Sequence, residues 1–168
     1  MRMSWQYSYN SNNTARYTLG EYTNPINKTL ICVGINPSTA TPNKLDRTLN
    51  KVKAIAMNQK YVNWIMLNVY PQRATNPSNL HKRCNKQLHN TNLNEIRNIL
   101  ITFSNSDILF AYGNLIDKRP YLKVCLTDIL NLISAVQFSG NFYCIERTKK
   151  GNPVHPLYQK TNCSLINY

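Results

Sequence analysis

The sequence predicts an α/β fold, a three-layer α/β/α sandwich around a central, mostly parallel, four-stranded sheet. Short continuous apolar runs alternate with longer segments in which apolar residues recur at helical spacing. Runs without polar alternation are typical of parallel strands, because such strands are buried on both faces. The 168 residues suit one domain, and we expect residues 1–15 to form a flexible N-terminal arm.

Four segments have the composition of buried strands. They are residues 29–34, 62–70, 107–113 and 141–146. The first ends in Gly34 and the third in Gly113, residues at which the backbone can turn sharply. A further short strand is expected near residues 16–19. The tail from 148 to 160 reads as a loop because it is rich in Pro and Gly.

Three segments between the strands carry an apolar stripe at helical spacing. They cover residues 45–56, 88–103 and 121–133. Asp46 lies near the start of the first, where a carboxylate interacts favourably with the helix dipole. Ligands of such sheets bind beyond the carboxyl ends of the strands. We therefore expect the functional site in the loops after Gly34, Tyr70, Gly113 and Glu146.

The charge balance indicates a polyanionic partner. Twenty Lys and Arg against seven Asp and Glu give a net charge of +13, which attracts nucleic acid or an anionic membrane and also aids solubility. We favour nucleic acid, DNA or RNA, as the partner. The acidic residues are scattered singly, whereas two-metal nucleases and paired-carboxylate glycoside hydrolases need clustered carboxylates. Both enzyme classes are therefore disfavoured.

The cysteine pattern gives no sign of a metal site. Five cysteines occur without a CxxC motif or zinc-type spacing, so we expect no metal, no iron–sulfur cluster and no other cofactor. An odd number of cysteines without a signal peptide fits a reducing cytoplasm. No stretch approaches the roughly 18 uncharged apolar residues of a membrane-spanning helix. We predict a cytoplasmic monomer with no membrane contact.

Asn36 and His155 are the candidate catalytic residues. Pro37 forces Asn36 into an extended conformation at a strand end, where its amide could orient a water molecule. His155, followed by Pro156, could donate a hydrogen bond to a developing anion. Each has a simpler reading, an Asn-Pro turn that caps a helix or an ordinary surface histidine. His81 and His89 are predicted to be surface residues.

The segment after the second strand supplies candidates for nucleic-acid recognition. Asn68 could read a base edge, Tyr70 could stack on a base and Arg73 could hold a phosphate. The alternatives are a buried Asn that fixes the loop, a core Tyr and a solvated Arg. Basic residues near other strand ends are candidates for DNA binding, although such clusters are usually solvated: Lys118, Arg119, Lys149 and Lys150.

Several of these motifs resemble those of the uracil-DNA glycosylase superfamily. GINPS at residues 34–38 is similar to the GINPG motif of its mismatch-specific uracil/thymine branch. HPLY at residues 155–158 resembles the HPSP-type second motif, and NVYP at residues 68–71 resembles the segment that reads the pyrimidine edge. The ordered motifs RYxL, NPSTAxxxxxDxT, RATxP and TKxGxPxHPLY also resemble a domain family of bacteria and phages, over residues 16–160.

The resemblance implies a uracil-DNA glycosylase-like fold and a monofunctional DNA glycosylase that flips out a non-standard pyrimidine and leaves an abasic site. It assigns positioning of the attacking water to Asn36, stabilisation of the leaving base to His155 and base reading to Asn68. Asp46 is the carboxylate near this loop and would assist the water or the sugar cation. The substrate would bind along Gly34, Ile35, Pro37, Ser38, Tyr70 and Tyr158.

The chain departs from the superfamily motifs at two places. Ser38 replaces the second motif glycine, and Leu157 and Tyr158 replace the small residues after HP. The base stays open: uracil, mismatched thymine, an oxidised pyrimidine or a bulky phage-type modified pyrimidine, in DNA repair or in anti-phage defence. Two other functions stay open as well, a non-catalytic nucleic-acid-binding module and a hydrolase of free nucleotides or nucleosides.

Overall fold

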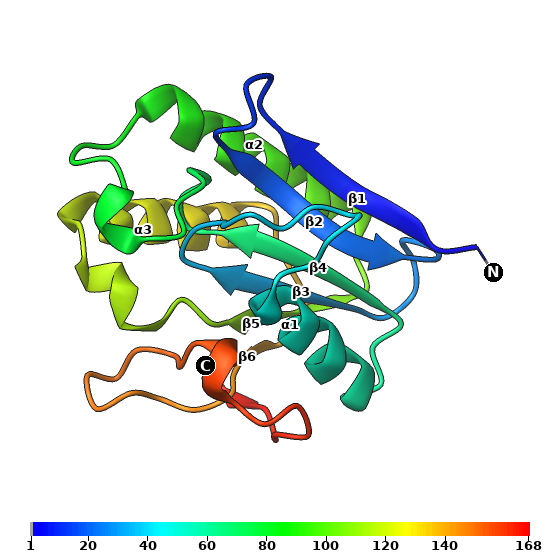
Figure 1. Ribbon diagram of the computed structural model, residues 1–168. Coiled ribbons are helices and arrows are strands. Elements are labelled where there is room, and N and C mark those ends of the chain that lie inside the picture. Colours follow the sequence, from blue (N-terminus) through cyan, green and yellow to red (C-terminus); the bar gives the residue numbers. More distant parts are fainter. Residues whose placement is uncertain (1) are drawn as a thin grey trace.

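A seven-stranded mixed sheet forms the middle layer of the protein. In the computed structural model, which describes residues 2–168, the strand order is β1-β2-β4-β3-β5-β6-β7 (Figure 1). Four neighbouring strands are parallel and correspond to the four predicted apolar runs: β4 (Asn63–Asn68), β3 (Thr29–Gly34), β5 (Ser106–Phe110) and β6 (Phe142–Cys144). The α/β class and these four strands are confirmed.

The predicted sheet of four mostly parallel strands is wrong, because three antiparallel strands extend it. They are β1 (Ser4–Tyr9), β2 (Arg16–Tyr22) and β7 (Ile166–Asn167). Strand β1 pairs with β2 along its whole length, so these residues are a sheet edge rather than the flexible arm expected for residues 1–15. The physical reason is that an edge strand is only half buried, and it needs no continuous apolar run.

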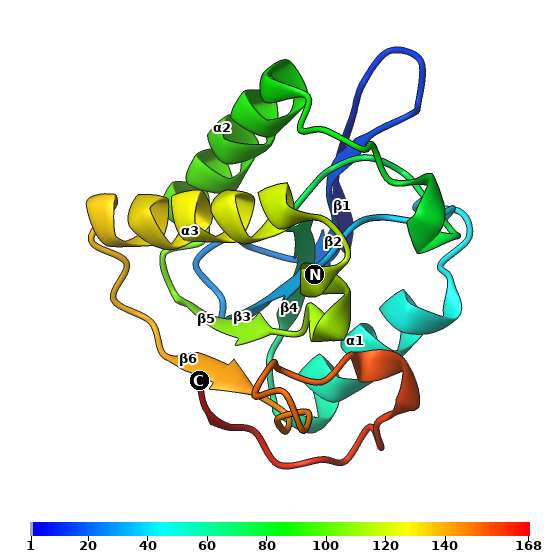
Figure 2. The same ribbon diagram turned by 90° about the vertical axis from the view of Figure 1, so that its left-hand side faces the viewer.

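Helices cover both faces of the sheet. Helix α1 (Arg47–Asn58) packs on one face, and α2 (Lys86–Thr102) and α3 (Pro120–Ala135) pack on the other (Figure 2). All three agree with the predicted helical segments. The carboxylate of Asp46 caps α1 by accepting a hydrogen bond from the backbone N–H of Leu49 at 2.9 Å. Among residues 2–168, no helix combines the length and apolar character needed to cross a membrane.

Backbone hydrogen bonds hold the loops together at the carboxyl ends of the parallel strands. The N–H groups of Val69 and Tyr70 each donate at 2.9 Å, to the carbonyls of Gly34 and Ile35. The loop after β5 enters a short 3-10 helix, η2 (Gly113–Asp117), through Gly113, whose φ is 63°. The backbone N–H of Gly113 donates to the carbonyl of Pro153, and another 3-10 helix, η3 (Pro156–Tyr158), follows. The C-terminal loop is thereby brought to the same edge as the loops after β3 and β4.

Candidate functional site

A cleft of about 680 Å³ opens at the carboxyl ends of the parallel strands. The arrowheads of β3 and β4 in Figure 1 point to this end of the sheet. We call it the strand-end cleft. It is bordered by the loop after β3, the start of α1, η2 and η3, and it brings together Asn36, Asp46, Asn68 and His155. The volume lies in the range of roughly 300–1,000 Å³ that is typical of ligand sites.

The side chain of Asn36 has a fixed orientation. Its Nδ2 donates to the carbonyl oxygens of Ala74 at 2.8 Å and Pro37 at 3.0 Å, with Gln72 at 3.5 Å. Because these partners are all acceptors, the nitrogen must face them and Oδ1 must face away. The half-buried side chain therefore uses its donor within the protein and keeps its acceptor for a ligand or a water molecule.

His155 is arranged as a neutral hydrogen-bond donor. Its Nδ1 accepts from the backbone N–H of Leu157 at 3.3 Å, so the ring proton of the neutral form lies on Nε2. Burial lowers the pKa of His155 below its usual value, and the negative charge of Asp46 opposes this in part. At neutral pH the residue can donate through Nε2 without carrying a positive charge.

Asn68 presents an unpaired amide to the strand-end cleft. The residue is fully buried, and neither Nδ2 nor Oδ1 has a hydrogen-bond partner within residues 2–168. Its backbone carbonyl is held by Nδ2 of Asn92 on α2 at 2.9 Å. A buried amide without partners is costly unless a ligand satisfies it. Gly34 lies beside it: a Cβ atom there would collide with Cε of Met66 and lie 3.6 Å from Oδ1 of Asn68.

The remaining predicted substrate residues lie along the same walls. Asp46 is the one carboxylate that lines the strand-end cleft within the described chain, and its Oδ1 is already engaged as the cap of α1. The last residue of β3, three residues of the loop after it and one of η3 also line it: Gly34, Ile35, Pro37, Ser38 and Tyr158. Tyr158 is 84% exposed, which places it at the entrance.

The structure does not bring Tyr70 to this site. Tyr70 is fully buried on the α2 and α3 side of the sheet, where its hydroxyl bonds Nδ1 of His81 at 2.8 Å and accepts from the N–H of Asn85 at 3.0 Å. Of the two readings of Tyr70 in the sequence, this position corresponds to the core residue. Stacking on a base from this position is sterically excluded.

Two predicted DNA-binding arginines instead hold loops in place. Arg73 donates to the carbonyls of Ser38 and Ala40 and, at 3.1 Å, to the hydroxyl of Tyr7. Arg119 donates to three carbonyls of the segment before α2, those of Ser78, Leu80 and His81. Because these guanidinium groups are engaged within the protein, they are poor candidates for binding phosphate.

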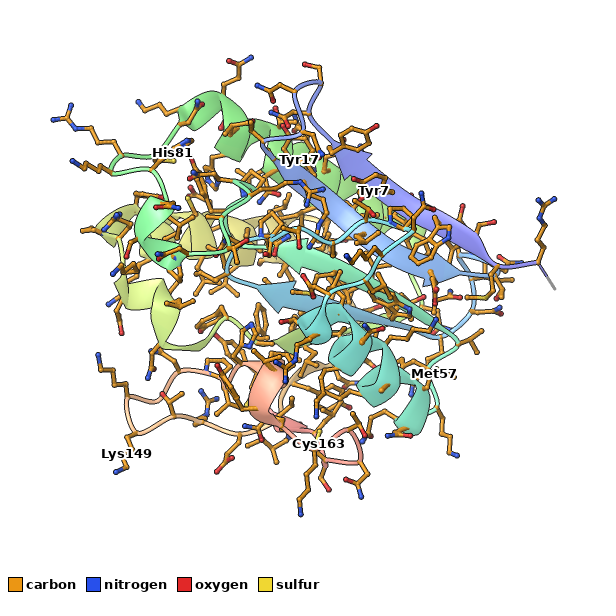
Figure 3. All side chains as sticks on the ribbon, in the orientation of Figure 1. Tyr7, Tyr17, Met57, His81, Lys149 and Cys163 are labelled. Carbon is orange, nitrogen blue, oxygen red and sulfur yellow. The ribbon has the colours of Figure 1, made fainter. Side chains whose placement is uncertain are left out.

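Three predicted DNA-binding lysines are exposed. Lys118 follows η2, and Lys149 and Lys150 lie on a turn that projects from the molecule (Figure 3). This turn is tied to the wall of the strand-end cleft, because Oγ1 of Thr148 donates to Oδ1 of Asn114 at 2.8 Å. Lys150 lies 3.8 Å from Asp117, a loose ion pair.

The sequence assigns the chain to a family. A model of the family described as "Protein of unknown function (DUF1643)" matches residues 16–157. The chain belongs to this family. No curated protein and no solved structure matches it. The DUF1643 match contains Asn36, Asp46, Asn68 and His155, so the strand-end cleft lies within the family domain.

Two features of this DUF1643 chain are missed by sequence reasoning. Arg16, read only as part of a strand motif, is 1% exposed and lines the strand-end cleft. His89, predicted on the surface, is buried and lies 2.9 Å from Asp128. A polar residue within a half-apolar stretch gives no indication of burial, because its partners come from distant segments.

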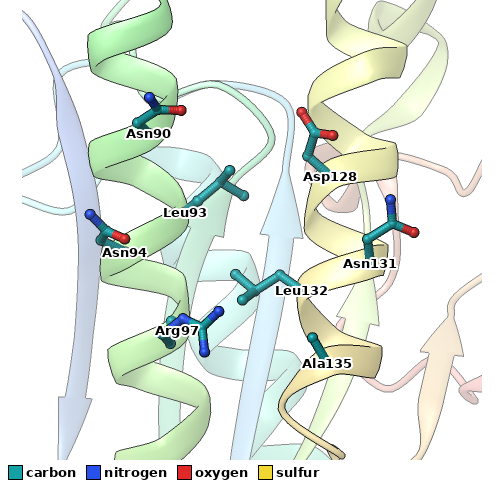
Figure 4. Close-up of a pocket in the computed structure, with 8 residues that line it drawn as sticks. All are labelled: Asn90, Leu93, Asn94, Arg97, Asp128, Asn131, Leu132 and Ala135. Carbon is teal, nitrogen blue, oxygen red and sulfur yellow. The ribbon is translucent and has the colours of Figure 1, made fainter.

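A second hollow of about 580 Å³ lies between α2 and α3 of the DUF1643 domain (Figure 4). Arg97 of α2 and Asp128 of α3 stand on its two sides, and its other polar lining residues are exposed asparagines. It lies in the helical layer, away from the strand ends. No group of three metal-binding side chains occurs here or elsewhere in the described part of the chain.

Proposed function

We propose that the protein is a monofunctional DNA glycosylase that hydrolyses the N-glycosidic bond of a non-standard pyrimidine. The observation that carries the proposal is the meeting of Asn36, Asn68 and His155 in one cleft, with an acceptor, an amide and a ring donor available to a ligand. A pyrimidine edge carries adjacent donors and acceptors, which an amide can pair. A base must be flipped out of the helix to reach such a cleft.

The reaction needs only a weak nucleophile. Breaking the bond between C1′ and N1 leaves an oxocarbenium-like sugar, to which a water molecule adds, while the bonding electron pair leaves with the base. Oδ1 of Asn36 orients this water, and the proton released after the attack passes to Asp46 or to solvent. Nε2–H of His155 donates to the oxygen of the departing base, and the amide of Asn68 pairs with its edge.

The basic surface supports DNA as the partner. Lys149 and Lys150 are exposed on the turn tied to Asn114 of the cleft wall, and the exposed Lys118 directly follows η2, which lines the cleft. A DNA backbone that passes along this side would meet their charges. A uracil-DNA glycosylase-like reading of the fold is part of the same proposal, as is a monomer in the cytoplasm. All five cysteines are free, which fits a reducing compartment. Repair and anti-phage defence use the same chemistry and differ in the base removed.

The test is a search for abasic sites. Duplexes that carry uracil, mismatched thymine, oxidised pyrimidines or bulky phage-type pyrimidines are incubated with the protein, and alkali-labile breaks are measured. Asn36→Ala and His155→Ala should each lower the rate by about 100- to 1,000-fold. His81→Ala, which changes a histidine outside the strand-end cleft, should form abasic sites at the wild-type rate. Full rates in both cleft variants would reject the assignment.

A negative result on the whole panel also discriminates. Salt-sensitive binding of DNA without any abasic product would identify a non-catalytic binding module. Release of free base from mononucleotides, with no affinity for long DNA, would identify a hydrolase of nucleotides.

A further inference from the structure

Arg16 is a buried cation on the wall of the strand-end cleft. It is 1% exposed, Nη1 donates to the carbonyl of Ala40 at 3.2 Å, and Nε has no partner in the described chain. No carboxylate of residues 2–168 forms an ion pair with it. A buried guanidinium normally has an anionic partner, and Arg16 has none in the described chain.

The surroundings of Arg16 favour an added negative charge. Arg73 donates to the same carbonyl of Ala40 at 3.2 Å, so two guanidinium groups converge on one neutral acceptor. Burial and the charge of Arg73 lower the pKa of Arg16 to about 10, and the charge of Asp46 opposes this in part. The side chain is still a cation at neutral pH.

The start of helix α1 adds to the positive potential around Arg16. Arg47, Thr48 and Leu49 form its first turn and line the strand-end cleft. Of the N–H groups in this turn, that of Leu49 is used by the capping carboxylate of Asp46. Helix N-termini carry a partial positive charge and orient N–H groups toward anions. The first turn of this helix of 12 residues and Arg16 therefore line the same cleft.

We propose that Arg16 and the start of α1 form a receptor for an oxyanion, so that the ligand of the strand-end cleft is a phosphate-bearing nucleotide rather than a bare nucleoside or base. This inference rests on the proposed function, in which the oxyanion is a backbone phosphate next to the flipped nucleotide. A free mononucleotide offers the same chemistry through its terminal phosphate. A forked guanidinium suits a phosphate, because it can donate two parallel hydrogen bonds.

Binding experiments on the full chain test this without any cleavage step. Deoxyuridine, deoxyuridine monophosphate and inorganic phosphate are titrated by calorimetry. Two short single-stranded oligonucleotides with one deoxyuridine follow, one with normal phosphates and one with neutral methylphosphonates beside that nucleotide. Deoxyuridine monophosphate should bind at least about tenfold more tightly than deoxyuridine, and the oligonucleotide with normal phosphates at least about tenfold more tightly than the one with methylphosphonates. Equal affinities, or binding of none of the probes, would overturn the receptor.

Variants of Arg16 test whether the phosphate preference depends on this residue. Arg16→Gln should lose the phosphate preference, and Arg16→Lys, which keeps the charge without the fork, should lose most of it. Arg97→Gln removes one exposed guanidinium from α2 and should keep the full preference. Circular dichroism checks that each variant is folded. If Arg16→Gln does not fold, Arg16→Lys, which keeps the positive charge at this position, carries the comparison.

The outcomes separate the receptor from the glycosylase. A phosphate preference without abasic sites on any substrate keeps the receptor and rejects the glycosylase. Abasic sites without a phosphate preference keep the glycosylase and reject the receptor. If the mononucleotide binds as tightly as the oligonucleotide, the oxyanion is a terminal phosphate. Tighter binding of the oligonucleotide identifies it as a backbone phosphate.

Discussion

The side-chain nitrogen of Asn36 lies 2.8 Å from the carbonyl oxygen of Ala74, so one amide joins the loops after β3 and β4 while it lines the strand-end cleft. Asn36→Asp would place a carboxylate oxygen where this donor stands. Carbonyl oxygens cannot pair with it, and we expect the free energy of unfolding to fall by about 1–3 kcal/mol. Urea unfolding at pH 7 measures the change.

The exposed Asn43 provides the matched control, because Asn43→Asp makes the same chemical change in the loop before α1. We expect this variant to stay within about 0.5 kcal/mol of the wild type. Equal stability of the two variants would mean that the amide of Asn36 does not make these contacts in solution.

His155 should make stability depend on pH. Burial lowers its pKa in the folded state below the usual value of 6.5, so the unfolded chain binds this proton more readily. The wild type should therefore gain stability as the pH rises toward 6.5 and lose it below. His155→Asn should flatten this part of the curve. Urea unfolding at several pH values between 5 and 7.5 gives the difference, and parallel curves for the two proteins would contradict the shift.

The central strands could be predicted because strands buried on both faces consist of continuous apolar residues. TLICVG in β3 and NWIMLN in β4 are almost uninterrupted apolar runs, and both are buried throughout. The edge strand β1, SWQYSY, is half exposed, so its apolar residues are diluted by polar ones. Strand β7 has only two residues, and its position follows from pairing with β6 rather than from any local preference.

The candidate site was predictable where proline fixes the backbone. Asn36 follows the end of β3 and His155 is the N-cap of η3; each precedes a proline, and both line the strand-end cleft. Tyr70 also precedes a proline, but its position was not predictable, because its burial among α2 and α3 is decided by packing rather than by its neighbours in the chain. Arg16 was not predictable either, since its one acceptor belongs to Ala40, far along the sequence.

Gly34, which lines the strand-end cleft, is also expected to be important for the packing of Met66. A Cβ atom at this position would collide with the end of the Met66 side chain, which is flexible and must move. Gly34→Ala should lower the free energy of unfolding by about 1–3 kcal/mol. Met66→Ala in the same chain removes the collision, so the double variant should be more stable than the sum of the single effects predicts. Strict additivity in urea unfolding would show that the two residues do not meet.

Asn92 is expected to support the strand-end cleft from the opposite face of the sheet. Its Nδ2 donates to the carbonyl of Asn68 at 2.9 Å, and the residue is fully buried. Asn92→Ala leaves that carbonyl without its side-chain partner and should cost about 1–3 kcal/mol in urea unfolding. Asn98→Ala, at an exposed position of the same helix, is the control and should change stability little. Because Ala is a better helix former than Asn, helix propensity cannot explain a loss, and a loss as large in the control would show that the contact with Asn68 is not its cause.

The lysine turn should control how strongly DNA binding depends on salt. Lys149 is exposed on the turn tied to the wall of the strand-end cleft through Thr148 and Asn114. Each lost phosphate contact reduces the slope of log K against log salt by about 0.9 on duplex DNA. Lys149→Gln should therefore bind duplex DNA with a slope shallower by up to about 0.9. Lys60→Gln removes an exposed lysine at the opposite end of β4, and its slope should equal that of the wild type. Fluorescence anisotropy titrations measure the slopes. If both variants reduce the slope by the same amount, DNA binding depends only on the net charge of the protein, and the turn does not contact the DNA.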